Sequence, residues 1–252
     1  MSGRATALAA ACALWTGVTA VAGATGATVA TRGVAPSASL PAGVASVERA
    51  TVPVLLVPGW FDSARDLAAM RIHLLGAGWP GSHVGTLTFR EPTGSNRDHA
   101  EELAAALGDL RSASGADSVD IVAHSMGGLA VRWYLLTHPD APVRRAVFIA
   151  SPHRGTLSAH LAWGDGRDDM MPGSPFLDTL NTRAPVPPGV DVITVRTLID
   201  THIVPGESAT LPGAPDYALC CSTHAGLLQD RDVLEIVRSF LELGVVPREP
   251  SR

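Results

Sequence analysis

The sequence predicts an α/β domain built on a mostly parallel sheet of about six strands that is flanked by helices. Short runs of β-branched and aliphatic residues alternate along the chain with segments of helical periodicity, an order typical of a parallel sheet covered on both faces. The chain has 252 residues, of which 46% are hydrophobic and 17% charged. This length is enough for one such domain with a sizeable core, but two domains of this kind are not expected.

The predicted elements follow one another from residue 51 onward. Each strand is a short run dominated by aliphatic side chains, in chain order Val52–Val57, Val84–Phe89, Val119–Ala123, Val143–Ala150, Val190–Leu198 and Tyr217–Cys221. Each helix repeats apolar residues at three- or four-residue spacing, in chain order Ala64–Leu75, Asp98–Leu110, Met126–Thr137 and Gly226–Leu243. Pro139 ends the third helix, because proline cannot continue it. The stretch 153–188 is rich in glycine and proline, and we expect it to be irregular.

The amino terminus has the pattern of a secretory signal. Arg4 precedes an apolar stretch, Ala5–Ala22, that ends in small residues, so we expect residues 1–22 to be removed on export to the extracellular space. A membrane-anchoring helix is the alternative, but it needs about 20 strongly apolar residues, and threonine and glycine dilute this segment. Residues 23–50 lack periodicity and are expected to form a flexible lead-in to the domain at 51–252.

Charge and cysteine usage restrict the partners and the compartment. A net charge of -5 without runs of lysine or arginine argues against nucleic acid as a partner, because its phosphates demand a basic face. Cys220 and Cys221 are adjacent in a chain expected to enter an oxidising compartment. They form either a strained bridge or two free buried thiols, and the sequence leaves both alternatives open.

Ser125 stands where the strand at 119–123 meets the next helix. This strand–turn–helix context, with Gly127 two residues after the serine, is typical of a nucleophile elbow, a sharp turn that projects the serine oxygen above a sheet. Ala123 occupies the position of the usual first glycine, and its methyl group is small enough for the turn. The backbone N–H of Met126 then lies at a helix N-terminus, where it can stabilise an oxyanion.

The partners of such a serine follow it in the order carboxylate, then histidine. Asp200 comes directly after the strand at 190–198, and His224 precedes the final helix, so we predict them as the orienting acid and the general base. Asp191 and Asp216 are weaker alternatives, because each lies at the entering end of a strand. His202 is the rival histidine, but it is too close to Asp200 in the chain to reach the serine while that aspartate orients it.

The loop after the first strand should supply a second oxyanion donor. Its segment Pro58-Gly59-Trp60-Phe61-Asp62 makes the backbone N–H of Trp60 the favoured candidate, with Phe61 as the alternative. His124 and His153 are expected to support the site rather than to carry protons.

Taken together, these residues resemble the class 2 triacylglycerol lipases, small secreted bacterial enzymes of the α/β-hydrolase fold. The resemblance runs from Val52 to the final helix and is strongest at Val119–Tyr134, which holds Ala-His-Ser-Met-Gly-Gly at the nucleophile. The segments 151–156 and 200–205 look like the family's segment after the next strand and its acid loop. One departure is Pro58-Gly59, where many relatives carry His-Gly.

The resemblance implies a secreted carboxylester hydrolase that forms an acyl-enzyme and uses no metal or organic cofactor. The expected partner is a small-molecule or lipid ester, with a transient contact to a lipid interface, and the chain is expected to be a monomer. A small or absent lid is implied, although the stretch 170–177 exceeds what a minimal enzyme needs and could form a small cap. Apolar residues near the predicted mouth should bind the acyl group, namely Phe61, Leu129, Met171, Phe176 and Val204.

Two other functions stay open at the level of sequence. An acyltransferase or a thioesterase can use the same triad, and it differs from an ester hydrolase only in its acyl acceptor or its acyl donor. A non-catalytic lipid-binding protein can retain the same fold without the chemistry.

Overall fold

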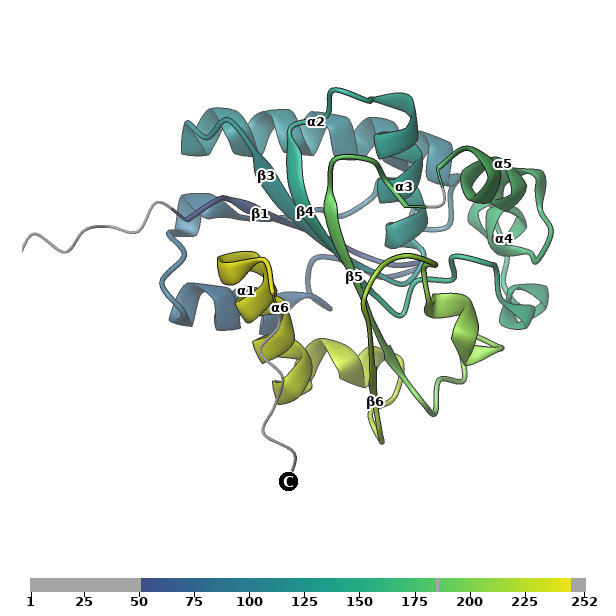
Figure 1. The fold of residues 1–252 in the computed structure, drawn as a ribbon. Helices are drawn as coiled ribbons and strands as arrows, with labels where there is room; N and C mark the ends of the chain where they lie inside the picture. The colour runs from purple at the N-terminus through teal and green to yellow at the C-terminus, as the bar shows by residue number, and fades with distance from the viewer. Residues whose placement is uncertain (1–50, 185, 246–252) are drawn as a thin grey trace, which may run out of the picture. The chain divides into compact units, whose positions relative to one another are not determined.

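The computed structural model describes residues 51–184 and 186–245. The predictions of a signal segment and a lead-in concern residues 1–50 and lie outside the described residues. Within the described part, six strands form one sheet in the order β2-β1-β3-β4-β5-β6, and all neighbouring pairs are parallel (Figure 1). The strands are β1 (Val54–Val57), β2 (Val84–Thr86), β3 (Val119–His124), β4 (Val143–Ile149), β5 (Asp191–Thr197) and β6 (Asp216–Leu219).

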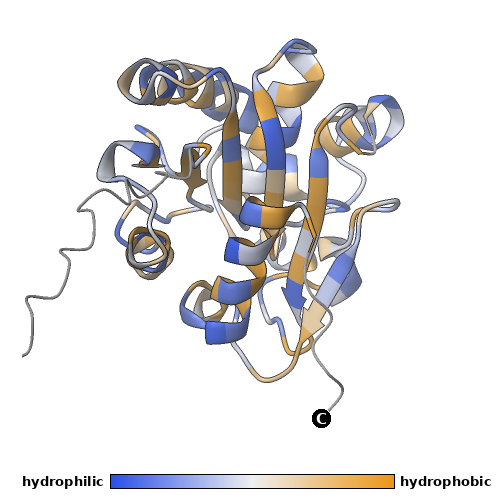
Figure 2. Ribbon diagram, turned by 60° about the vertical axis from the view of Figure 1, so that its left-hand side comes forward, coloured by the Kyte–Doolittle hydropathy of each residue, from blue (hydrophilic) through white to orange (hydrophobic). Residues whose placement is uncertain are grey.

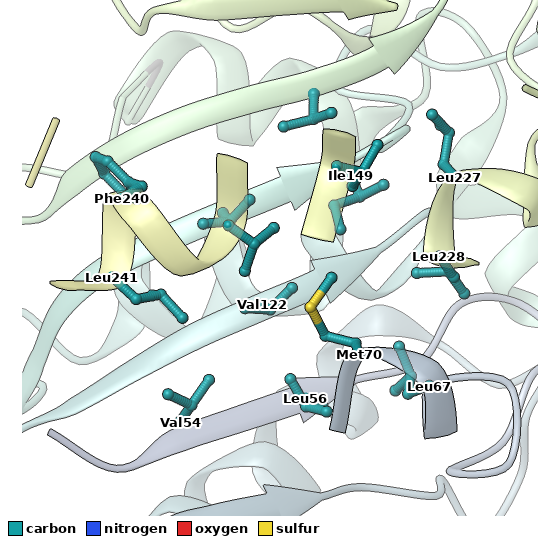
Figure 3. Close-up of a cluster of buried hydrophobic side chains, with 14 of the residues drawn as sticks. Val54, Leu56, Leu67, Met70, Val122, Ile149, Leu227, Leu228, Phe240 and Leu241 are labelled. Carbon is teal, nitrogen blue, oxygen red and sulfur yellow. The ribbon is translucent and has the colours of Figure 1, made fainter. Parts of the chain in front are cut away.

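Helices cover both faces of this sheet, as the alternation of side chains along β1 requires. Val54 and Leu56 are fully buried with residues of α1 (Ala68–Gly76) and α6 (Arg231–Leu243), as Figure 3 shows. Their neighbours in the strand, Leu55 and Val57, join a second cluster with residues of α2 (Asn96–Ser114) and α3 (Gly127–Thr137). Figure 2 shows that the helices combine hydrophilic and hydrophobic residues, which suits helices with one face toward the core.

The segment between β4 and β5 is more regular than the sequence predicts. The expected irregular stretch 153–188 contains a 3-10 helix at Leu157–Leu161, α4 (Asp165–Met170) and α5 (Pro175–Arg183). Ser174 caps α5 by accepting a hydrogen bond from the backbone N–H of Leu177, so the helix begins at a local signal. The prediction was wrong because helices of six and nine residues are too short to show a clear apolar period.

The end of the chain is also divided differently from the prediction. The expected single helix 226–243 consists of a 3-10 helix at Ala225–Gln229 followed by α6. Asp230 separates the two, because its extended backbone breaks the first helix while its carboxylate caps the second by accepting from two backbone N–H groups. No helix among the described residues is both long and apolar enough to cross a membrane.

Two further 3-10 helices are short, at Gly81–His83 before β2 and at Gly206–Ala209 between β5 and β6. Cys220 and Cys221 follow β6 and are joined by a disulfide, which is one of the two alternatives that the sequence left open. Because all six strands are parallel, the loops after β1, β3, β5 and β6 all leave the same edge of the sheet. The candidate site is built from these four loops together with the segment that follows β4.

Candidate active site

Ser125 occupies a strained turn between β3 and α3. Its φ of 50° lies in the left-handed region, which a residue other than glycine rarely adopts without tertiary support. The support comes from the neighbouring strand, because the Ser125 N–H donates to the carbonyl of Ile149 at 2.8 Å. Gly127 is required two residues later, since a Cβ there would lie 2.2 Å from the Pro58 carbonyl oxygen. The serine side chain therefore stands above the sheet on a backbone held by its neighbours.

His224 and Asp200 meet beside this turn. The Nδ1 atom of His224 lies 2.9 Å from Oδ2 of Asp200, although the two residues follow different strands. The other carboxylate oxygen of Asp200 accepts hydrogen bonds from the backbone N–H groups of His202 at 2.8 Å and Ile203 at 2.9 Å. These bonds fix the carboxylate, which in turn orients the imidazole.

The two weaker carboxylate candidates lie elsewhere. Asp191 begins β5 and pairs with Arg145, and Asp216 begins β6 and pairs with Arg196. Both are at the entering ends of their strands, away from the loops that surround Ser125. The structure therefore brings Asp200 to His224 and leaves the alternatives in ion pairs at the opposite edge of the sheet.

Burial and hydrogen bonding shift the pKa values of His224 and Asp200. Burial lowers the pKa of His224 below its ordinary 6.5, because it disfavours the imidazolium, and the hydrogen bond to Asp200 offsets only part of this effect. For Asp200, burial favours the neutral acid, but the hydrogen bonds from His224 and from two backbone N–H groups outweigh it and lower the pKa. At neutral pH the arrangement thus holds a neutral imidazole next to an ionised carboxylate.

A cavity of about 520 Å³ opens at this site, and Ser125 and His224 both line it. Within the described residues, no hydrogen bond joins the Ser125 hydroxyl to the imidazole, and such contacts often tighten only when substrate is bound. The apolar part of the wall includes Trp60, Trp163 and Ile203. The Trp60 indole N–H donates to the Trp163 carbonyl at 3.2 Å, so the loop after β1 is tied to the segment before α4.

Four of the five residues predicted to bind an acyl group do not line this cavity, and only Phe61 does. Leu129 and Phe176 are buried in a core cluster between α3 and α5, and Met171 packs against that cluster. Val204 also lies outside the lining, and its backbone N–H donates to the Thr156 hydroxyl. The structure thus places these four residues outside the cavity wall, because an apolar side chain near the mouth serves the core equally well.

The backbone N–H groups predicted as oxyanion donors belong to the two segments that flank Ser125. Met126 follows the serine directly, and the loop that carries Trp60 touches the serine through Gly59, where a Cβ would lie 2.8 Å from the Ser125 Cβ. Within the described residues, no hydrogen bond occupies the backbone N–H of Met126 or of Trp60. Both groups are thus free to donate to a ligand, as an oxyanion site requires.

One group within the described residues has the residue types of a metal site. Ligand atoms of Asp200, His202 and His224 lie within 4.8 Å of one another. The carboxylate oxygens are already engaged by the imidazole and by two backbone N–H groups, and the His202 ring stacks on the His224 ring at 4.7 Å. This set of bonds suits the orientation of an imidazole better than the chelation of an ion.

Sequence reasoning missed several residues of the site. Trp163 and Leu161 line the cavity but lie in the stretch expected to be irregular, where no periodic signal marks them. His124, expected as a support, bonds Asp62 at 2.9 Å, and its ring lies 4.7 Å from the His224 ring. His153, also expected as a support, is fully buried and stays outside the lining. A second depression of about 400 Å³, between α1 and α6, is separate from this site.

Comparisons with known proteins agree with this architecture. A family model described as the alpha/beta hydrolase fold matches residues 52–188, which is more than half of the chain, and it confirms the predicted fold class. The mature form of Bacillus licheniformis lipase BlEst2 is similar, with 17% identity and a TM-score of 0.65 over 77% of this chain and 92% of that chain. Aspergillus fumigatus lipase B has 20% identity and a TM-score of 0.66 over 80% of this chain and 55% of its own. At such identities the structural likeness shows the fold alone.

Proposed function

The chain belongs to the α/β-hydrolase family, and from this premise we propose that it is a secreted serine hydrolase of lipid-like carboxylic esters. One observation supports the proposal most strongly. A histidine that is fixed by a buried carboxylate shares a cavity wall with a serine on a strained strand-to-helix turn. This arrangement serves to activate a hydroxyl group for attack on a carbonyl carbon.

In the proposed reaction, His224 removes the proton from the Ser125 hydroxyl as that oxygen attacks the ester carbonyl. The negative charge that develops on the carbonyl oxygen is stabilised by the backbone N–H groups of Met126 and Trp60. The protonated imidazole then gives its proton to the departing alcohol, which leaves an acyl group on the serine. Water, deprotonated by the same imidazole, releases the acid, while Asp200 stays ionised and stabilises the imidazolium.

The wall of the cavity supports an ester with an apolar acyl group. Aromatic side chains of Trp60, Phe61 and Trp163 contact one another at ring-centroid distances of 4.6 to 5.8 Å along one side. Several large apolar side chains around this region are more than half exposed, namely Phe61, Leu157, Leu161 and Trp163. Exposed apolar groups gathered around a mouth favour a transient contact with a lipid surface.

Export is part of the proposal. The apolar stretch after Arg4 has the form of a secretory signal. The disulfide between Cys220 and Cys221 suits an oxidising compartment outside the cytosol. The likeness to two lipases supports a lipase or an esterase within this class, and the finer resemblance to class 2 triacylglycerol lipases stays a prediction.

An organophosphonate that carries a fluorescent tag tests the proposal directly. We expect it to label the wild-type protein at Ser125 and to leave Ser125→Ala unlabelled, while Ser112→Ala, an exposed change on α2, labels normally. Turnover of a panel of p-nitrophenyl esters and of emulsified triglyceride then identifies the preferred acyl length. Equal labelling of Ser125→Ala, or a wild-type protein that neither labels nor turns over esters, would reject the proposal.

A further inference from the structure

A second histidine–aspartate pair stands beside the proposed triad. His124 ends β3, directly before Ser125, and its Nδ1 lies 2.9 Å from Oδ2 of Asp62 in the loop after β1. The His124 side chain is 3% exposed and that of Asp62 is 28% exposed, and both residues line the cavity. The proposed mechanism does not use this pair.

The bond between Asp62 and His124 joins two segments that must meet around Ser125. Gly59, in the same loop as Asp62, packs so closely that a Cβ would lie 2.8 Å from the Ser125 Cβ and 2.8 Å from Oδ2 of Asp62. The loop itself turns sharply, with a φ of 60° at Phe61 and a backbone bond from the Asp62 N–H to the Gly59 carbonyl. Asp62 is therefore the side chain that holds this turn to the residue next to the nucleophile.

A packing role alone does not account for the imidazole. The second ring nitrogen of His124, Nε2, is buried and has no hydrogen-bond partner within the described residues. A buried polar atom without a partner costs free energy, and an apolar side chain of similar shape avoids that cost. The polar contact with Asp62 is what a histidine provides here and an apolar residue does not.

The carboxylate is ionised at neutral pH and available as an acceptor. Burial alone would raise the pKa of Asp62, but the hydrogen bond from His124 and the electrostatic influence of the same histidine outweigh burial and lower it. His124 then donates from Nδ1, which fixes its tautomer and the orientation of its ring beside His224.

We propose that Asp62 is a positioning residue that acts through His124 to hold the loop of the second oxyanion donor against the nucleophile turn. This inference rests on the proposed function. An oxyanion donor works only when its N–H lies about 2.7–3.1 Å from the charged oxygen. Loss of the bond lets the Trp60 N–H move relative to that of Met126, and a misplacement of about 1 Å costs on the order of a hundredfold in rate.

The test compares two carboxylates of the same loop. Asp62→Ala removes the acceptor for His124. Asp66→Ala removes an exposed carboxylate whose hydrogen bonds within the described part of the chain go to Ser63, three residues away. We expect Asp62→Ala to lower kcat about 10- to 100-fold with KM changed by less than about twofold, because an oxyanion contact acts in the transition state. Asp66→Ala should keep both parameters within about twofold of wild type.

One inhibitor and three further variants separate positioning from general damage. Inhibition by a trifluoromethyl ketone, which forms a tetrahedral oxyanion on the serine, should weaken in Asp62→Ala by about the same factor as kcat/KM falls. Asp62→Asn retains an acceptor oxygen and should recover most of the lost activity. His124→Phe breaks the same bond from the other side, so it tests the inference even if Asp62→Ala does not fold. In the double variant, Asp62→Ala with His124→Phe, the loss should not exceed that of the larger single variant.

Asp62→Ala that behaves like Asp66→Ala would overturn the inference, as would losses that multiply in the double variant or a change confined to KM. A wild-type protein that neither labels with the phosphonate nor turns over esters would instead defeat the proposed function itself. The two failures are therefore distinguishable.

Discussion

Two histidine–aspartate pairs lie at the cavity: the first pair is His224 with Asp200, and the second pair is His124 with Asp62. Both have a distance of 2.9 Å between the histidine Nδ1 and the aspartate Oδ2, but they differ in how firmly the carboxylate is held. Asp200 has a side chain that is 1% exposed, and it accepts two backbone N–H bonds in addition to the bond from His224. Asp62 has a side chain that is 28% exposed, and it bonds His124 from the loop after β1. The difference shows that an Asp–His bond does not by itself define a role. A base that must keep one orientation through every proton transfer needs the more rigid partner.

The largest expected effect tests this difference directly. Asp200→Asn should lower kcat/KM by about 10³- to 10⁴-fold, because an amide favours the wrong imidazole tautomer and cannot stabilise the imidazolium. This loss should exceed that of Asp62→Ala by at least about tenfold. Steady-state turnover of one p-nitrophenyl ester by both variants makes the comparison. Equal losses in the two variants would contradict the different roles assigned to Asp200 and Asp62.

Gly59→Ala should displace Asp62 from His124 and leave the contact between Asp200 and His224 unchanged. The added methyl group meets the Ser125 Cβ and the Asp62 carboxylate at 2.8 Å, so the loop after β1 must move away from the nucleophile turn. We expect kcat to fall on the order of a hundredfold. Gly108→Ala on α2, where a Cβ meets nothing within 4 Å, is the matched control, and its activity should not change. A Gly59→Ala variant with wild-type kcat would show that the loop position does not matter.

The pH dependence of kcat/KM should reveal the titration of His224 in the first pair. Only the neutral imidazole can accept the serine proton, and burial lowers the pKa of His224 below 6.5. Activity should therefore persist below pH 6.5 and then fall about tenfold for each further pH unit. In Asp200→Asn the acid limb should move to still lower pH, because the contact that favours the imidazolium is lost. A wild-type limb above 6.5 would contradict this assignment.

His153 is a buried histidine without a carboxylate partner among the described residues, so it contrasts with both pairs. Its expected effect is on the free energy of unfolding. His153 is fully buried, both ring nitrogens lack partners within the described residues, and burial holds its pKa well below 6.5. Since the unfolded chain binds the proton first, the free energy of unfolding should fall as pH drops below 6.5. The contribution approaches about 1.4 kcal/mol per pH unit. Urea unfolding of wild type and His153→Gln at several pH values measures it, and parallel curves would contradict it.

The parts of this protein that depend on neighbouring residues in the chain could be predicted from sequence. The turn at Ser125 was visible because a buried strand, small residues and a helix follow one another within a few positions. Asp200 and His224 were predicted from their order in the chain and their place after strands, and the structure brings their side chains together. The short helix at Pro175–Arg183 was not, because nine residues hold too few turns for a period to stand out.

Other contacts between residues far apart in the sequence could not be predicted from it. Leu129 and Phe176 are as apolar as a residue of the cavity wall, and only the packing of α3 against α5 places them in the core. Asp62 and His124 are 62 positions apart and meet because β1 and β3 are neighbours in the sheet. The periodicity that specifies a helix or a strand depends on residues close together in the sequence. The surroundings of a side chain depend instead on how complete elements pack against one another.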